Sequence, residues 1–311
     1  MAIYQKFNDF FVASRRFNGL NAPLMINSRS APNWHLQPVD RLKVTAVSAF
    51  TDNYIWLIHS PTHPQQVVAV DPGDSQAVMT ALQKMQLKLA AILITHHHTD
   101  HVGGVLELLE HHEVPVFGPV GEAIPGNPNQ VTKDQPPDLA EFGLEFEVLN
   151  IPGHTKGHIA YSGHGSLFCG DTLFSAGCGR LFEGTAQQMT QSLSRLSQLP
   201  PATQVYCAHE YTLANLSFAL VAEPDNQDIH QHLIVAQKLR DQNLPTLPST
   251  IDLELKINPF LRLHNATIKR AASDYRGKTL EDESEIFCAL RDWKNNFKPS
   301  PISISTRPLG R

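Results

Sequence analysis

One short stretch constrains the fold of this chain more than any other. Residues 95–101 read THHHTDH and directly follow the apolar run AAILI at 90–94. The imidazoles and the carboxylate of this motif could not all face one metal ion from a helix, so they require a strand that has just ended. The run before them is short and β-branched, which predicts a buried strand of the parallel type. The Gly-Gly pair at 103–104 then opens a segment with the pattern of a helix. We therefore expect the motif on a strand-to-helix loop.

Histidines two residues apart on such a loop can bind one ion, while the next Asp-His pair points at a second ion. Seven residues would not supply every ligand of two ions, so more donors are expected from later loops. Three candidates each end a short apolar run, and an aspartate among them can bridge two ions. The expected ligands are His96, His98, Asp100, His101, His154, Asp171 and His209, and the intervening His97 and Thr99 are interpreted as spacers.

A simpler interpretation of these histidines is a solvated loop, because the chain contains 16 of them. An isolated histidine favours that interpretation, whereas the HxHxDH spacing at a strand end favours metal binding. Asp71, at the end of another expected strand, leaves two interpretations open. Either it orients a ligand imidazole by accepting its second N–H group, or it is an ordinary turn residue.

The remaining pattern predicts strands that alternate with helices up to residue 210 and mainly helices beyond it. Strands are expected at 43–49, 53–59, 67–71, 114–117, 144–149, 159–162, 167–169 and 204–208, with helices after 74 and at 185–198, and a loop over 118–138. Further helices are expected at 211–221, 228–242 and 281–297. This order fits two stacked sheets with helices outside, followed by a helical appendage.

These motifs resemble the metallo-β-lactamase superfamily, and from about residue 43 to 298 the chain is similar to glyoxalase II, the hydroxyacylglutathione hydrolases. Besides 95–101, the resemblance is carried by FTDNYIW at 50–56, PGHT at 152–155, CGDTLF at 169–174, GCGR at 177–180, FEGT at 182–185, HEYT at 209–212 and NPFLR at 258–262. It implies an α/β fold, a metallo-β-lactamase-like αββα sandwich of two mixed sheets with outer helices, plus a C-terminal helical domain.

The resemblance also implies a dinuclear metal centre. The first ion would be held by His96, His98 and His154, the second by Asp100, His101 and His209, with Asp171 as the bridge. Zinc is the expected metal, with iron or manganese as alternatives. A hydroxide activated by both ions would attack the thioester of S-D-lactoylglutathione and release D-lactate and glutathione, the second step of methylglyoxal detoxification. Asp100 and Asp171 are the expected catalytic residues, Asp100 by orienting the hydroxide.

Glutathione binding is the second property that the resemblance implies. The matching positions are Arg180, Tyr211, Arg291 and Lys294, together with Phe182. Two of these depart from the family pattern, because Arg180 stands where lysine is frequent and Phe182 where a tyrosine often contributes its hydroxyl. Arginine keeps the positive charge and adds a planar fork of donors, whereas phenylalanine loses a hydrogen bond.

Charge and composition narrow the alternatives. A net charge of −5 and an isoelectric point near 6.3 give no basic surface for nucleic acid, which disfavours a tRNA-processing nuclease. Other hydrolases of the superfamily stay open, such as a lactonase, a lactamase or a phosphodiesterase, as does a one-iron persulfide dioxygenase. A non-catalytic metal-binding or regulatory module is also open, although a complete ligand set argues against it.

The length of 311 residues favours more than one domain. We expect a leader or extension at 1–41 that lacks fixed structure and is dispensable, a catalytic domain at 42–210 and a helical substrate-binding domain at 211–311. The four cysteines lack CxxC spacing, which predicts reduced thiols, and no apolar run is long enough to span a bilayer. A cytoplasmic monomer without membrane contact is therefore expected. The arginines of the leader keep a mitochondrial transit peptide open as an alternative.

Overall fold

The computed structural model describes residues 41–298, so the expected leader, apart from Arg41, lies outside the described residues. Its strands are β1 (Val44–Ala49), β2 (Asn53–His59), β3 (Gln66–Val70), β4 (Lys88–Leu93), β5 (Val116–Pro119), β6 (Asn129–Val131), β7 (Glu147–Asn150), β8 (Ile159–Gly163), β9 (Ser166–Gly170), β10 (Leu173–Phe174), β11 (Gly177–Cys178), β12 (Gln204–Cys207) and β13 (Ser249–Thr250). Its α-helices are α1 (Ser75–Met85), α2 (Thr99–Val102), α3 (Val105–His111), α4 (Ala186–Ser197), α5 (Thr212–Ala222), α6 (Gln227–Asp241), α7 (Ile251–Ile257), α8 (Ala266–Arg276) and α9 (Glu283–Asn296).

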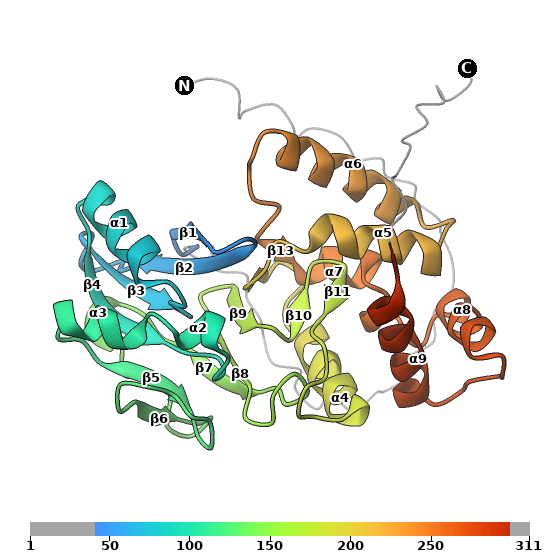
Figure 1. Ribbon diagram of the computed structural model, residues 1–311, viewed down its shortest axis with the longest axis horizontal. Coiled ribbons are helices and arrows are strands. Elements are labelled where there is room, and N and C mark those ends of the chain that lie inside the picture. The colour runs from blue at the N-terminus through green and yellow to red at the C-terminus, as the bar shows by residue number, and fades with distance from the viewer. Residues whose placement is uncertain (1–40, 299–311) are drawn as a thin grey trace, which may run out of the picture. The chain divides into compact units, whose positions relative to one another are not determined.

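Two mixed sheets form the centre of the fold (Figure 1). The first sheet has the order β1-β2-β3-β4-β5-β6, with antiparallel pairing up to β3 and parallel pairing from β3 to β6. The second has the order β13-β12-β9-β8-β7, in which only β12 and β9 run parallel. With helices outside the two sheets, this is the metallo-β-lactamase fold that the sequence predicted, followed by the predicted helical region.

The five central residues of strand β2, Tyr54 to Ile58, are all hydrophobic, because both faces of the strand are covered. Ile55 and Leu57 belong to the cluster that β1–β4 share with α1 and α3, whereas Trp56 and Ile58 belong to the cluster shared with the second sheet. Because both faces are covered, a hydrophobic and polar alternation is absent from this strand. The Trp56 indole also donates to the Cys207 carbonyl over 3.0 Å and so joins the two sheets.

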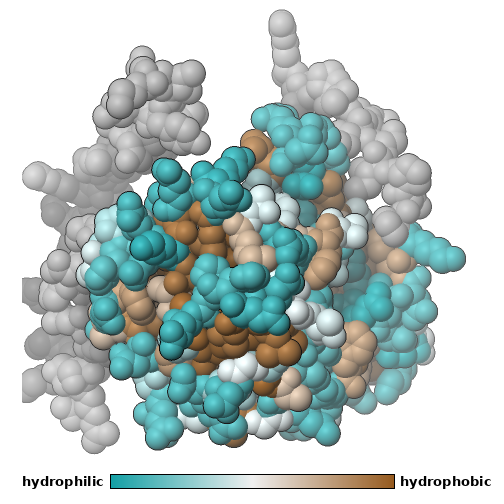
Figure 2. Space-filling view, turned by 60° about the vertical axis from the view of Figure 1, so that its left-hand side comes forward, coloured by the Kyte–Doolittle hydropathy of each residue, from teal (hydrophilic) through white to brown (hydrophobic). Residues whose placement is uncertain are grey.

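Helices α1 and α3 cover the outer face of the first sheet with one apolar side each. Val78 and Leu82 of α1 and Val105 and Leu108 of α3 are buried in the shared cluster. Figure 2 brings this side of the molecule forward and shows hydrophilic side chains around areas of apolar ones. Such a mixture is ordinary for a folded surface, because polar atoms alone cannot cover it.

The helical region is joined to the second sheet by hydrogen bonds as well as by packing. Strand β13 pairs with β12 and so completes one edge of that sheet. Glu210 follows His209 in the loop after β12. It accepts hydrogen bonds from the Tyr54 hydroxyl (2.9 Å) and the Thr246 amide (2.8 Å). The start of the helical region is therefore tied both to β2 and to the segment before β13.

Helix α7 fixes the short hairpin β10-β11. Glu254 is fully buried and accepts hydrogen bonds from the Ala176 amide (2.8 Å) and the Asn258 side chain (3.0 Å). Asn258 donates in turn to the carbonyls of Phe174 and Gly177 on the hairpin. Burial raises the pKa of Glu254, because the charged carboxylate is poorly solvated there. The hairpin leads directly into residues 179–184, so α7 indirectly sets the position of that loop.

Several predicted element boundaries were wrong. The segment 118–138 contains β6, which pairs in parallel with β5, and the strand expected at 144–149 is β7, at Glu147–Asn150. The helical region contains α7 and α8 in addition to the three predicted helices. Among residues 41–298, no helix is both long and apolar enough to cross a membrane.

Candidate metal centre

The central motif lies where β4 ends, as predicted, but its second half is already helical. His96 and His98 precede α2, and His98 has the extended conformation of an N-cap residue. Asp100 and His101 lie in the single turn of α2, ahead of the helix expected after the Gly-Gly pair. Because the backbone changes from extended to helical after His98, the side chains of His96 and His98 point in a different direction from those of Asp100 and His101.

The first group of ligand atoms consists of three imidazole nitrogens. His98 Nδ1 lies 3.1 Å from His96 Nε2 and 2.9 Å from His154 Nε2. His154 belongs to the loop after β7, so residues distant in sequence meet here. Asp171 Oδ2 lies 3.4 Å from His154 Nε2 and adds a carboxylate to this group.

The second group adjoins the first through the other oxygen of the same carboxylate. Asp171 Oδ1 lies 3.4 Å from His101 Nε2 and 3.2 Å from His209 Nε2. Asp100 Oδ2 lies 3.4 Å from each of these two nitrogens. All seven expected ligands therefore lie in two adjoining groups, with Asp171 common to both.

The separations of 3.2–3.4 Å between the carboxylate oxygens of Asp100 and Asp171 and the neighbouring imidazole nitrogens fit metal binding. Two ligand atoms at about 2.0–2.1 Å from one tetrahedral ion lie roughly 3.3–3.4 Å apart. His101 Nε2 and Asp171 Oδ1 are buried and make no hydrogen bond of good geometry within residues 41–298. Unpaired buried polar atoms are costly, and a cation between them would satisfy both. Divalent metal binding, which the sequence predicted, is thus supported by the side chains themselves.

The electrostatics of the two groups differ. Burial lowers the pKa of His96, His98 and His154, so these imidazoles are neutral, which is the form that binds metals. Burial would also lower the pKa of His209, but hydrogen bonds with the carboxylates of Asp100 and Asp171 raise it to about 10. The carboxylates of Asp100 and Asp171, which favour the protonated form of His209, also attract a divalent cation. A bound cation would displace that proton.

The side chains of the expected ligands are held in place by a second layer of polar groups. Asp71 Oδ2 lies 3.0 Å from His101 Nδ1, and its two oxygens also accept from the amide and hydroxyl of Thr95. Of the two interpretations of Asp71, this contact supports the first, because Asp71 faces the second nitrogen of the expected ligand His101. The corresponding contacts of other ligands are Asp52 Oδ1 to His209 Nδ1 (2.8 Å), Asn53 Nδ2 to Asp100 Oδ2 (2.9 Å) and the Arg180 carbonyl to His154 Nδ1 (2.8 Å).

Sequence reasoning missed Asp52, Asn53 and His158 as parts of this layer. His158 stacks on His96 with ring centres 4.5 Å apart, and its Nε2 accepts from the Asp171 amide over 3.2 Å. A local signal existed for the first two, because they lie in the TDNY stretch where the second predicted strand begins. Nothing in the spacing of His158 separates it from an ordinary core histidine.

Asp171 is reached through an unusual backbone turn. Gly170 has φ of +47°, and a Cβ atom at this position would lie 2.3 Å from Thr95 Oγ1. Only glycine tolerates both the left-handed backbone and this close approach. The Gly-Asp pair of the CGDT motif is therefore required for the carboxylate to reach both groups of histidines.

An open cleft of about 510 Å³ begins at these ligands. It is lined by His154, Asp171 and all five expected substrate-binding residues, namely Arg180, Phe182, Tyr211, Arg291 and Lys294. The Tyr211 ring stacks on His209 at 4.7 Å, and Phe182, 64% exposed, packs edge-on against His98 and His154. Positive side chains thus face a cleft whose inner end is the carboxylate and histidine cluster.

The two expected cations on α9 differ in their surroundings. Arg291 is buried, and its Nη1 donates to the Cys178 carbonyl over 2.8 Å while its guanidinium lies 5.3 Å from the centre of the Phe260 ring. Lys294 is partly exposed, with Nζ donating to the Ala214 carbonyl over 2.7 Å. Burial lowers the pKa of Lys294 to about 8, and the nearby Arg291 adds to this effect.

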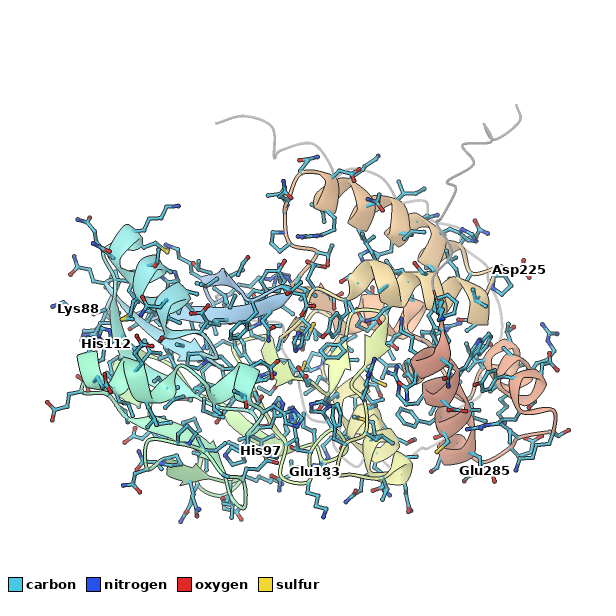
Figure 3. The ribbon with its side chains drawn as sticks, in the orientation of Figure 1. Lys88, His97, His112, Glu183, Asp225 and Glu285 are labelled. Carbon is cyan, nitrogen blue, oxygen red and sulfur yellow. The ribbon has the colours of Figure 1, made fainter. Side chains whose placement is uncertain are left out.

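The interpretation of His97 as a spacer between ligands is incomplete, because its side chain has partners of its own. Its Nδ1 lies 2.7 Å from Glu122 Oε2, and its Nε2 lies 3.2 Å from Glu183 Oε1. Figure 3 shows His97 and Glu183 as neighbours on two different loops. The side chain between the two histidine ligands therefore makes contacts of its own, outside the metal centre.

The chain matches two family models, which meet just after His209, the last of the expected ligands. Residues 50–209 match the metallo-beta-lactamase superfamily, and residues 210–297 match the family described as hydroxyacylglutathione hydrolase C-terminus. Both matches lie within the part of the sequence that carried the resemblance.

Similar whole proteins agree with these matches. A hydroxyacylglutathione hydrolase of Nitrosomonas europaea is 48% identical over 257 residues, which cover 83% of this chain and 97% of the relative. Another from Photobacterium profundum is 52% identical over 258 residues, covering 82% of this chain and all of the relative. Among solved structures, ETHE1 from Myxococcus xanthus superposes with a TM-score of 0.57 at 25% identity, covering 83% of this chain and 92% of that one.

Proposed function

This chain belongs to the hydroxyacylglutathione hydrolase family, also called glyoxalase II, of the metallo-beta-lactamase superfamily, and from this membership we propose how its own residues act. The enzyme hydrolyses S-2-hydroxyacylglutathione thioesters such as S-D-lactoylglutathione, with D-lactate and glutathione as products. The observation that carries the proposal is the continuity of one cleft from the Asp171 cluster to Lys294.

We assign the metal ligands as two sets that share one carboxylate. His96, His98 and His154 would hold one ion, Asp100, His101 and His209 the other, and Asp171 both, one oxygen to each. Zinc suits this mixture of imidazole and carboxylate ligands, as iron and manganese also do. When bound, the two ions would supply an activated water at neutral pH and polarise the substrate carbonyl.

The side chains around this centre orient the reactants. Asn53 donates to one oxygen of Asp100 over 2.9 Å, which fixes the carboxylate so that its free lone pairs can accept a hydrogen bond from the attacking water or hydroxide and orient it. Phe182 would shield the histidine side of the centre from bulk water. Because a thiolate is a weak base, the leaving group requires no strong general acid, and the cleft residues need only hold it in place.

Glutathione would lie along the outer part of the cleft. Its carboxylates are anionic, and Arg180, Arg291 and Lys294 bring positive charge to the cleft of an acidic protein. Tyr211 offers a hydroxyl and a flat ring that is held by its stacking on His209. We propose that these four residues bind the glutathione portion and that Phe182 contacts the acyl side.

The direct test is hydrolysis of S-D-lactoylglutathione beside a panel of lactones and β-lactams, with metal content measured on the same sample. We expect release of one free thiol per thioester and two ions per chain in the fully active enzyme. Faster turnover of a lactone would contradict the substrate assignment. Full activity with a single ion per chain would contradict the dinuclear centre, and sulfite production from glutathione persulfide would favour the persulfide dioxygenase alternative.

Substrate binding should depend on pH through Lys294. Its pKa near 8 means that the ammonium is charged below pH 8 and becomes neutral above it. We expect KM for the thioester to rise between pH 7.5 and 9.5, by up to about tenfold per pH unit above the pKa, with a smaller change in kcat. Initial rates across this range test this expectation. A KM profile that is flat, or that persists after Lys294→Met, would contradict the role of this charge.

We further propose that the enzyme acts as a monomer in the cytoplasm. The four cysteines are free, three of them are buried, and this fits a reducing compartment. Sedimentation of the purified protein would establish the oligomeric state.

A further inference from the structure

A glutamate with a buried side chain lies beside the metal centre, and within residues 41–298 it makes no hydrogen bond to the side chains of the seven expected ligands. Glu122 belongs to the connection between β5 and β6, and its side chain is 2% exposed. One of its oxygens accepts from the His97 amide over 2.7 Å and lies 2.7 Å from His97 Nδ1. The other accepts from the Thr155 hydroxyl and, over 2.8 Å, from the Gly157 amide. The carboxylate therefore meets four donors, two from each of two loops.

These two loops are the ones that carry the three imidazoles of the first group. His97 lies between His96 and His98, and Thr155 follows His154. The expected second group, Asp100, His101 and His209, has its own orienting partners in Asp71, Asp52 and Asn53. The bonds of Glu122 thus act on one half of the centre.

His97 extends the same connection to a third loop. Its Nε2 faces Glu183 Oε1 at 3.2 Å, and Glu183 Oε2 accepts from the Lys156 amide over 3.1 Å. The amides of Phe182 and Glu183 both donate to the His154 carbonyl. Glu183 is therefore joined to the loop of His154 in addition to the loop of His97, and it lies next to the residue that covers the histidines.

The cluster of His97, Glu122 and Glu183 is close enough to be compared with a metal site. Its geometry argues against one, because the two glutamates face opposite nitrogens of the same imidazole ring. A single ion cannot be reached by both nitrogens at once. The Glu122 oxygens are moreover already occupied by N–H and O–H donors. The cluster is a brace between loops.

We propose that Glu122 is a positioning residue for the first metal ion. It holds the loop of His96 and His98 and the loop of His154 at a fixed separation, while His97 links this brace to Glu183. This inference rests on the proposed dinuclear centre and names a residue outside its ligand set. A buried carboxylate suits the role, since it can accept from several donors at once and bonds to charged acceptors are strong.

The test compares two glutamine variants of buried glutamates. Glu122→Gln keeps the shape but replaces one accepting oxygen by an amide group that faces donors. Glu223→Gln is the matched control, because Glu223 is also buried and accepts from Arg262 at 2.8 and 2.9 Å, but lies in the helical region. Both proteins are equilibrated against graded free zinc concentrations, and the zinc content per chain and the thermal midpoint of the metal-free form are measured.

We expect Glu122→Gln to bind one of its two ions about tenfold to a hundredfold more weakly than wild type, with the other ion unchanged. Glu223→Gln should bind both ions as wild type does, even where its thermal midpoint falls by as much. If Glu122→Gln is insoluble, Thr155→Val, which removes one donor, replaces it and should weaken the same single ion about threefold to tenfold.

Two results would overturn the proposal. One is unchanged binding of both ions by the variant, and the other is an equal weakening of both ions or of both glutamine variants, which would indicate general loss of structure. A wild-type protein that binds fewer than two ions would instead contradict the dinuclear centre. The failure of the brace and the failure of the proposed function are therefore distinguishable.

Discussion

Asp171→Ala is expected to reduce kcat for the thioester on the order of 10³-fold or more, because this carboxylate is common to both groups of ligands. Its oxygens lie 3.4 Å from His154 Nε2 and 3.2 Å from His209 Nε2, so one substitution removes a donor from each group. The remaining histidines would then face one another without the negative charge that offsets a dication. Metal content should fall at both positions, and elemental analysis beside steady-state kinetics would measure both effects.

Asp225→Ala is the control for loss of a carboxylate as such. Asp225 is exposed and, as Figure 3 shows, lies between α5 and α6, away from the loops of His97 and Glu183. This variant should retain both ions and full activity. If Asp171→Ala kept two ions per chain and lost less than about tenfold in rate, the shared-carboxylate arrangement would be wrong.

Lys294→Met is expected to raise KM for the glutathione thioester about tenfold to a hundredfold with little change in kcat. A charge-assisted hydrogen bond to a carboxylate contributes about 1.5–3 kcal/mol, and this contact is made equally in the ground state and the transition state. Lys294 is the suitable position because its Nζ can still donate hydrogen bonds after its bond to the Ala214 carbonyl. Methionine is the suitable replacement because it preserves the packing of the apolar part of the lysine side chain.

Arg291 is less suitable for this experiment than Lys294. Its guanidinium is buried against Phe260 and donates to the Cys178 carbonyl, so truncation would disturb the hairpin as well as the cleft. Lys238→Met, at an exposed position of α6, is the matched control for loss of one positive charge. Equal KM values for Lys294→Met, Lys238→Met and wild type would show that glutathione is bound elsewhere.

The parts of the fold with strong periodicity could be predicted from the sequence. The strand before the motif, the alternation in β1 and the capped helix α4 follow from local patterns that packing reinforces. The seven expected ligands could be selected because each follows a short apolar run, which predicts a strand. Loops that follow strands ending at the same edge lie close together in space. Their spacing carried the information, and the structure places all seven in the two adjoining groups.

Short elements and orienting contacts could not be predicted, for a physical reason. Strand β6 has three residues and β13 two, so neither is long enough to show a period, and both exist because a neighbouring strand supplies hydrogen bonds. Glu122 lies in a segment rich in glycine and proline, where a lone acidic residue usually faces solvent. Its burial depends on donors from loops that are distant in sequence.

The edge strand β13 has a consequence for protein engineering. Exchange of substrate specificity between relatives is most simply attempted by cutting after the last histidine ligand and grafting a different C-terminal segment. In this chain such a cut would also remove the partner of β12 and the Thr246 amide that donates to Glu210, leaving an open sheet edge along Gln204 and Val205. A graft that retains residues 246–250 in place keeps that edge covered while exchanging the helices that line the cleft.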